Sequence, residues 1–93
     1  MISDFVKETF KKTFKYFDKN FTILIAIEEM SELQKELLKN INRSKNNQDK
    51  ILEELCDVYI FLELIKKVYN FDDLRVSKHI DQKVTEKMKL PEE

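Results

Sequence analysis

The chain has 93 residues, of which 42% are hydrophobic and 38% are charged, and it contains no glycine and a single proline. This length corresponds to one domain, residues 1–93, and the absence of glycine argues against tight hairpins and glycine-rich phosphate loops. Lys and Arg total 17 against 18 Asp and Glu, a net charge of −1, which argues against the broad positive surface of a nucleic-acid-binding protein.

The first predicted helix spans residues 3–17 and carries an aromatic stripe of Phe10, Phe14 and Phe17 at helical spacing. The second spans residues 21–41 and follows capping residues at 18–20. Its apolar positions recur every three or four residues: Ile23, Ala26, Ile27, Met30, Leu33, Leu37 and Ile41. Both patterns indicate amphipathic helices.

A polar loop at residues 42–48 separates this helix from a third, which spans residues 49–69. Between Leu55 and Ile65 the third helix is apolar nearly all round. Such a helix must be covered on several sides, which is more than a chain of 93 residues can supply. We therefore expect a homo-oligomer, either a homodimer or a homotetramer.

A fourth helix is predicted over residues 73–88, where Val76, Ile80, Val84 and Met88 recur every four residues. Four helices joined by short polar loops predict an all-α fold. The expected protomer resembles an antiparallel four-helix bundle and assembles as a homo-oligomer.

The chain has one cysteine, Cys56, so it can form no internal disulfide, and residues 1–4 lack the basic and apolar regions of a signal peptide. We expect a cytoplasmic protein and a buried Cys56 with a packing role. No apolar run approaches the roughly 20 residues that cross a bilayer, so no membrane partner is expected.

One acidic motif occurs twice, as EEMSE at residues 28–32 and as EELCD at residues 53–57. In each, two adjacent acids are followed three positions later by a third. Residues three apart project from one face of a helix, so Glu29 with Glu32, and Glu54 with Asp57, each form a two-pronged pair. If the two helices are neighbours, four carboxylates converge.

Several like charges at the edge of a core are costly unless they are protonated or paired. A divalent cation removes both costs, and a set of oxygen ligands suits Mg²⁺, with Mn²⁺ as a substitute, rather than zinc. The alternative is a solvated flank on which the acids pair with Lys35, Lys39 or Lys50.

With these motifs the chain resembles the MazG-like nucleotide pyrophosphohydrolases, an all-helical superfamily whose signature is EExxE followed after a helical span by ExxD. The resemblance covers roughly residues 21–87. It implies Mg²⁺-dependent hydrolysis of a nucleoside triphosphate between the α and β phosphates, with Glu29, Glu32, Glu54 and Asp57 as the metal ligands.

The resemblance also implies further roles. Glu28 matches an acid that orients or deprotonates the attacking water, and Lys50 matches a catalytic residue that holds a phosphate oxygen. Lys83 and Lys87, one turn apart, match substrate phosphate-binding residues. No tryptophan is present to stack on a base.

Two other functions are compatible with the sequence. The chain could be a non-catalytic helical oligomerisation or interaction module in which the acids tune pairing between subunits. It could also be a MazG-like protein that binds nucleotide without hydrolysing it.

Overall fold

The computed structural model describes residues 3–13, 18–43 and 46–88. These ranges contain four helices, α1 (Asp4–Thr13), α2 (Lys19–Arg43), α3 (Gln48–Val68) and α4 (Asp73–Lys87), and no strand. The predicted all-α class with four helices is therefore confirmed. The aromatic stripe of the first helix lies outside the described side chains, as do residues 14–17, the end of its predicted span.

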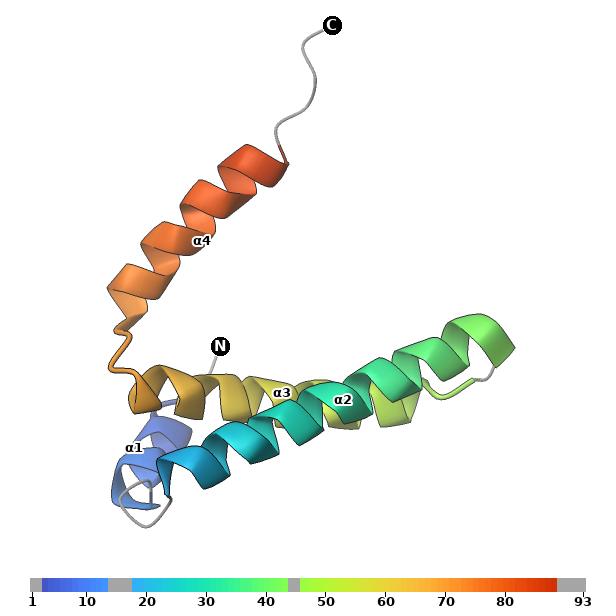
Figure 1. Ribbon diagram of the computed structural model, residues 1–93, viewed down its shortest axis with the longest axis horizontal. Coiled ribbons are helices and arrows are strands. Elements are labelled where there is room, and N and C mark those ends of the chain that lie inside the picture. The colour runs from blue at the N-terminus through green and yellow to red at the C-terminus, as the bar shows by residue number, and fades with distance from the viewer. Residues whose placement is uncertain (1–2, 14–17, 44–45, 89–93) are drawn as a thin grey trace, which may run out of the picture.

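Helices α2 and α3 pack side by side and run antiparallel, forming the hairpin at the centre of the molecule (Figure 1). Asp18 starts α2, because its carboxylate accepts a hydrogen bond from the backbone N–H of Phe21 at 3.2 Å. The residues that α2 and α3 bury lie along the line where the two helices meet, and we call this line the seam. They are Thr22, Ala26 and Glu36 on α2 and Glu54, Val58 and Leu64 on α3.

The apolar part of this core is small. Among the described residues, the buried hydrophobic side chains are those of Ala26, Val58 and Leu64. Larger apolar side chains on α3, such as Leu52 and Leu62, are exposed. Cys56 is exposed as well, so the expectation that it is buried was wrong; it lies on a side of α3 that no other described helix covers.

A side chain from the connecting segment fastens the far end of the hairpin. Asn47 is buried, and its amide donates hydrogen bonds to the backbone oxygen of Glu36 at 2.9 Å and to the Glu36 carboxylate at 3.5 Å. Its own amide oxygen accepts a hydrogen bond from Asn40 at 3.1 Å. These bonds connect the start of α3 to the last turns of α2.

The junction between α3 and α4 is a defined turn. Asn70 has a φ of 58°, and the N–H of Phe71 bonds to the carbonyl of Lys66 at 2.8 Å, the pattern of a Schellman cap. In a chain without glycine, asparagine takes the left-handed position because its short polar side chain tolerates it. Asp72 then caps α4 by accepting the N–H of Arg75 at 2.7 Å.

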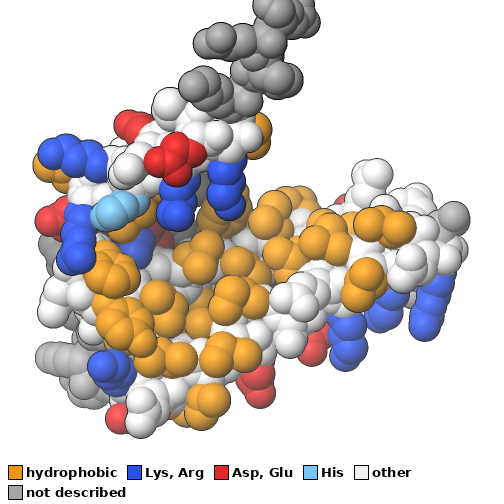
Figure 2. All heavy atoms as spheres, turned by 45° about the horizontal axis from the view of Figure 1, so that its top comes forward, with side chains coloured by type: hydrophobic (Ala, Val, Ile, Leu, Met, Phe, Trp, Pro, Cys, Tyr) orange, Lys and Arg blue, Asp and Glu red, His pale blue; other side chains and the backbone are white. Residues whose placement is uncertain are grey.

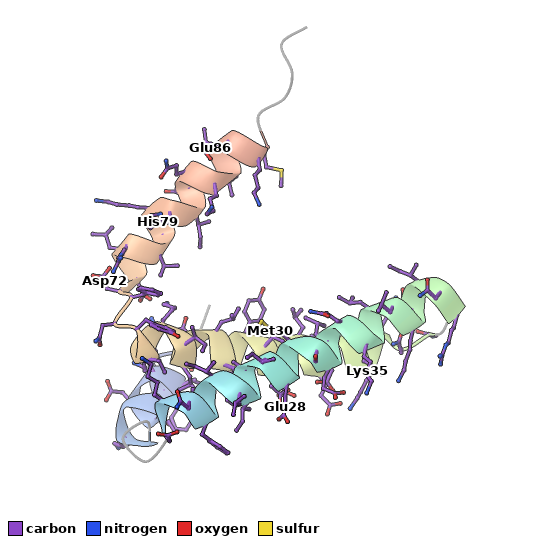
Figure 3. The ribbon with its side chains drawn as sticks, viewed as in Figure 1. Glu28, Met30, Lys35, Asp72, His79 and Glu86 are labelled. Atoms are coloured by element: carbon purple, nitrogen blue, oxygen red, sulfur yellow. The ribbon has the colours of Figure 1, made fainter. Side chains whose placement is uncertain are left out.

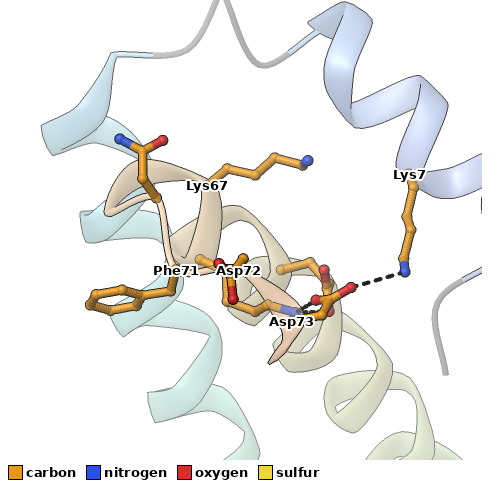
Figure 4. Close-up of a pocket in the computed structure, with 8 residues that line it drawn as sticks. Lys7, Lys67, Phe71, Asp72 and Asp73 are labelled. Atoms are coloured by element: carbon orange, nitrogen blue, oxygen red, sulfur yellow. Dashed lines mark hydrogen bonds and ion pairs between the residues drawn. The ribbon is translucent and has the colours of Figure 1, made fainter. Parts of the chain in front are cut away.

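Ion pairs surround this junction (Figure 4). Asp73 accepts hydrogen bonds from Lys66 and, at 3.4 Å, from Lys7 of α1, so one carboxylate connects three helices. A hollow of about 380 Å³ is lined by Lys7, Glu63, Lys66, Lys67, Asn70, Phe71, Asp72 and Asp73.

Beyond the junction, α4 leaves the hairpin at an angle and buries none of its described residues (Figure 1). Packing between helices is concentrated in the α2–α3 pair. None of the described helices combines the length and the apolar character that crossing a bilayer requires.

Candidate metal centre

Three of the four predicted ligands meet at the seam. Each of Glu29, Glu54 and Asp57 offers a carboxylate oxygen that lies within 4.8 Å of the other two. Glu29 comes from α2, and Glu54 and Asp57 come from α3, where a spacing of three residues places them on adjoining faces. The convergence expected from the repeated motif therefore occurs for these three acids.

The seam partly removes these acids from water. Glu54 is only 6% exposed, and Glu29 is half-buried. Burial raises the pKa of Glu29 above its ordinary value, and the charges of Asp57 and Glu54 raise it further. Like charges oppose ionisation when they share a site, so a cation would relieve the part of this pKa shift that comes from Asp57 and Glu54.

Glu32 is not one of the converging acids. Its side chain is 51% exposed and forms an ion pair with Lys35 at 3.8 Å. It lies one turn after Glu29 on α2, so it stays next to the group without joining it. A role for Glu32 as a ligand is still a prediction.

Glu28 and Lys50, the two predicted catalytic residues, are both exposed. Glu28 lies on the side of α2 opposite Met30, away from α4 (Figure 3). Lys50 contacts the site directly, because its ammonium lies 3.2 Å from the Glu54 carboxylate and 3.7 Å from that of Glu53. The hydrogen bond to Glu54 raises the pKa of Lys50.

The lysine pairs expected from the solvated-flank alternative also form. Lys35 pairs with Glu32, Lys39 with Glu36 at 3.2 Å, and Lys50 with Glu54. These pairs neutralise the edges of the acidic region. They do not account for the close approach of Glu29 to Asp57, which still leaves two carboxylates adjacent.

Lys83 and Lys87 lie on α4, which projects from the hairpin on the side that Met30 occupies, opposite Glu28 (Figure 3). Lys83 lines a separate hollow of about 330 Å³ with Phe71, Arg75, Val76, His79 and Ile80. Within one chain, the described structure does not bring these two lysines to the acids.

Glu36 is a seam residue that the sequence reasoning did not single out. It is buried, accepts a hydrogen bond from Asn47 and pairs with Lys39. Its position seven residues after Glu29, two helical turns along one face, was the available signal. It extends the buried acidic line toward the loop end of the hairpin.

The donor set is suited to a hard cation. All three converging groups are carboxylates, and two ligands of one Mg²⁺ at about 2.1 Å lie at most about 4.2 Å apart. Oxygens within 4.8 Å of one another therefore need only small side-chain adjustments to share an ion. Three carboxylates leave coordination positions open for waters or for phosphate oxygens.

Comparison with protein-family models, with curated proteins and with solved structures finds no match to this chain. Its function is therefore inferred from the residues at the seam.

Proposed function

We propose that the chain is a Mg²⁺-dependent nucleoside triphosphate pyrophosphohydrolase of the MazG-like kind, which cleaves between the α and β phosphates to release a monophosphate and pyrophosphate. The observation that carries this proposal is the convergence of Glu29, Glu54 and Asp57, one acid from EEMSE and two from EELCD. Mn²⁺ is the expected substitute for Mg²⁺.

In this proposal the acids at the seam, with Glu32 beside them, hold the cation through oxygen atoms. The ion, when bound, neutralises phosphate charge and lowers the pKa of a coordinated water. Glu28 is proposed to orient or deprotonate the attacking water. Consecutive residues on a helix point about 100° apart, so this role requires the water to lie at the exposed edge of the site. Displacement at one phosphorus then releases pyrophosphate.

Lys50 is supported as a phosphate-binding catalytic residue by its place beside Glu54, 3.2 Å away. An ammonium that pairs with a metal-ligating carboxylate is also within reach of an anion bound to the same metal. Lys83 and Lys87 keep their proposed phosphate-binding roles on the condition that α4 of some copy approaches the acids.

The proposal includes a homodimer or homotetramer and a bundle-like packing of helices within it, with a reducing, cytoplasmic setting in keeping with a single cysteine. Support for assembly comes from the exposed apolar side chains on α2, α3 and α4. No contact with nucleic acid or membrane is proposed.

Release of pyrophosphate from a panel of canonical and modified nucleoside triphosphates tests the activity, with Mg²⁺ and with a chelator. We expect turnover with Mg²⁺ and none with the chelator. Asp57→Asn and Glu54→Gln should each lower the turnover rate by about a hundredfold or more, the effect typical of removing an electrostatic group from an active site. Asp81→Asn, the same change at an exposed position on α4, is the matched control. A folded protein that turns over no nucleotide in the panel would overturn the proposal.

The exposure of so many large apolar side chains also favours a non-catalytic interaction module. That function predicts assembly and thermal stability that do not respond to Mg²⁺ or chelator. A protein that binds nucleotide without hydrolysis would instead gain thermal stability with nucleotide and release no product. The same samples distinguish the three functions.

A further inference from the structure

The α2–α3 hairpin has an exposed apolar face. On α2, Met30, Leu37 and Ile41 follow one another at intervals of seven and four residues and so share a side of the helix. On α3, Leu55 and Leu62 have the same spacing of seven. All five are exposed, Ile41 the most at 74%. We call these five residues the hairpin apolar face.

This face is turned toward α4. Met30 lies on the side of α2 toward α4 (Figure 3). Figure 2 shows hydrophobic side chains gathered in a band over the hairpin, below α4. In an antiparallel pair, side chains that are displaced from the line of contact in the same rotational sense lie on the same side of the pair. Leu55 and Leu62 of α3 are displaced from the seam in the same sense as Met30 and Leu37 of α2, so the apolar band extends over both helices.

Helix α4 carries a second unpartnered apolar surface. Val76, Ile80 and Val84 repeat at intervals of four residues, and we call them the α4 stripe. Ile80 is 54% and Val84 50% exposed. The hollow of about 330 Å³ lies along the first part of this stripe. Helix α4 thus has one side suited to burial, although it buries none of its described residues within the chain.

The chain exposes more surface than a compact monomer of its mass. The accessible surface is 7912 Å², whereas a compact monomer of 11.3 kDa exposes about 5,700 Å². The radius of gyration is 16.3 Å against about 12 Å for a compact chain of this length. The excess, about 2,200 Å², is of the size that each chain of an obligate homodimer buries.

We propose that a second copy of this chain covers both surfaces, with the α4 stripe of each copy packed against the hairpin apolar face of the other. Each chain carries both surfaces, so a two-fold axis between two copies produces two equivalent contacts, each between the α4 stripe of one copy and the hairpin apolar face of the other. Such an arrangement is closed and isologous. A net charge of −1 on each chain opposes the approach of two copies only weakly.

The α3–α4 junction favours a partner's hairpin over the chain's own. Three features of the junction hold α4 in its projecting direction. They are the left-handed backbone at Asn70, the cap formed by Asp72, and the ion pairs of Asp73 with Lys66 and Lys7. Folding α4 back onto its own hairpin would break these bonds. This inference deepens the assembly included in the proposed function, on which it rests, and it does not depend on hydrolysis. It places the partner's α4 on the Met30 side of the hairpin, opposite Glu28, so the phosphate-binding roles of Lys83 and Lys87 are not part of it.

The first test compares two glutamate substitutions on α4 by analytical ultracentrifugation. The unaltered chain is expected to sediment with twice the mass of one 11.3 kDa chain. Ile80→Glu, on the α4 stripe, should raise the dimer dissociation constant by a factor on the order of ten or more. Thr85→Glu, at an exposed position off the stripe, should leave it unchanged. A monomeric unaltered chain, or equal effects of the two substitutions, would overturn the proposal.

The second test uses the unaltered protein and so does not depend on the folding of a variant. Isotope-filtered nuclear Overhauser spectra of a mixture of labelled and unlabelled chains detect contacts between copies only. We expect cross-peaks from the methyl groups of Ile80 and Val84 to those of Leu37, Leu55 or Leu62. A tetramer with these contacts supports the proposal, whereas α4 contacts confined to one chain, or an assembly in which α4 stays uncovered, contradict it. An assembled but inactive protein refutes the proposed activity and leaves this inference standing.

Discussion

At the scale of single residues, the acids at the seam repel one another in the absence of a cation. Glu29 shows this most clearly, because burial, then the charges of Asp57 and Glu54, raise its pKa. We predict that Glu29→Gln increases the free energy of unfolding of the metal-free protein near neutral pH by up to about 1 kcal/mol, the size typical of partly exposed charge interactions. Thermal unfolding with a chelator present measures the change.

The same substitution should have the opposite effect when Mg²⁺ is present. The unaltered protein gains stability from a ligand that binds only the folded state, and Glu29→Gln, which removes one carboxylate ligand, should gain less. Asp81→Asn is the control, since it removes a charge from an exposed site on α4. If Mg²⁺ stabilised all three proteins equally, the seam would not be where the ion binds.

The residue scale also separates what sequence spacing predicts from what it does not. A spacing of three residues identified Glu54 and Asp57 as neighbours and drew attention to Glu29, since helical geometry alone fixes these directions. It could not tell that Glu32 turns to Lys35, because the choice between neighbouring partners depends on side-chain rotamers. Glu36 was missed because it lies outside the repeated motif, although it shares the face of Glu29.

At the scale of elements, the hairpin depends on a small number of buried polar contacts. Asn47 is buried and bonds to both Glu36 and Asn40. We predict that Asn47→Ala lowers the free energy of unfolding by about 1–3 kcal/mol, because it removes the buried hydrogen bonds that Asn47 makes to Glu36 and Asn40. Asn46→Ala, the adjacent exposed position, should change it by less than about 0.5 kcal/mol. Equal effects in denaturant titrations would show that Asn47 does not fasten the hairpin.

The α3–α4 junction gives a pH dependence at the same scale. Hydrogen bonding to Lys66, with the charge of Lys7, lowers the pKa of Asp73. A depressed carboxyl pKa contributes stability that is present above the ordinary Asp value and is lost as pH falls through the lowered value. Asp73→Asn should therefore flatten the acid side of the stability profile below about pH 4. Thermal unfolding of both proteins across that range, with Asp81→Asn as control, checks this; parallel profiles for Asp73→Asn and the unaltered chain would contradict it.

Most element boundaries followed from local chemistry, whereas the junction did not. Asp18 caps α2 as the sequence indicated, and Asp72 caps α4 in the same way, because capping depends on a few adjacent residues. The left-handed Asn70 was not anticipated in a chain without glycine. A single asparagine between two helices carries too little signal to set the direction in which the second helix leaves.

At the scale of the whole molecule, the sequence indicated which helix would need further cover better than it indicated where α4 lies. Apolar residues around α3 indicated a helix that needs several neighbours, and α3 does expose Leu52, Leu55 and Leu62. In the proposed dimer, the placement of α4 depends on surfaces that one chain leaves uncovered. Sequence periodicity shows which side of a helix is apolar and not which molecule covers it.

The last prediction follows from the small core. Ala26, Val58 and Leu64 are the buried hydrophobic side chains among the described residues, so in the proposed dimer much of the apolar burial that offsets the entropy of ordering the chain comes from association. Folding and association should then be one transition. Each tenfold increase in protein concentration should add about 1.4 kcal/mol to the apparent stability of the dimer, and the midpoint of guanidinium unfolding should rise accordingly. A monomer stabilised by its own contacts would show the same midpoint at every concentration. Ile80→Glu should lower the midpoint at each concentration while the midpoint still rises with concentration.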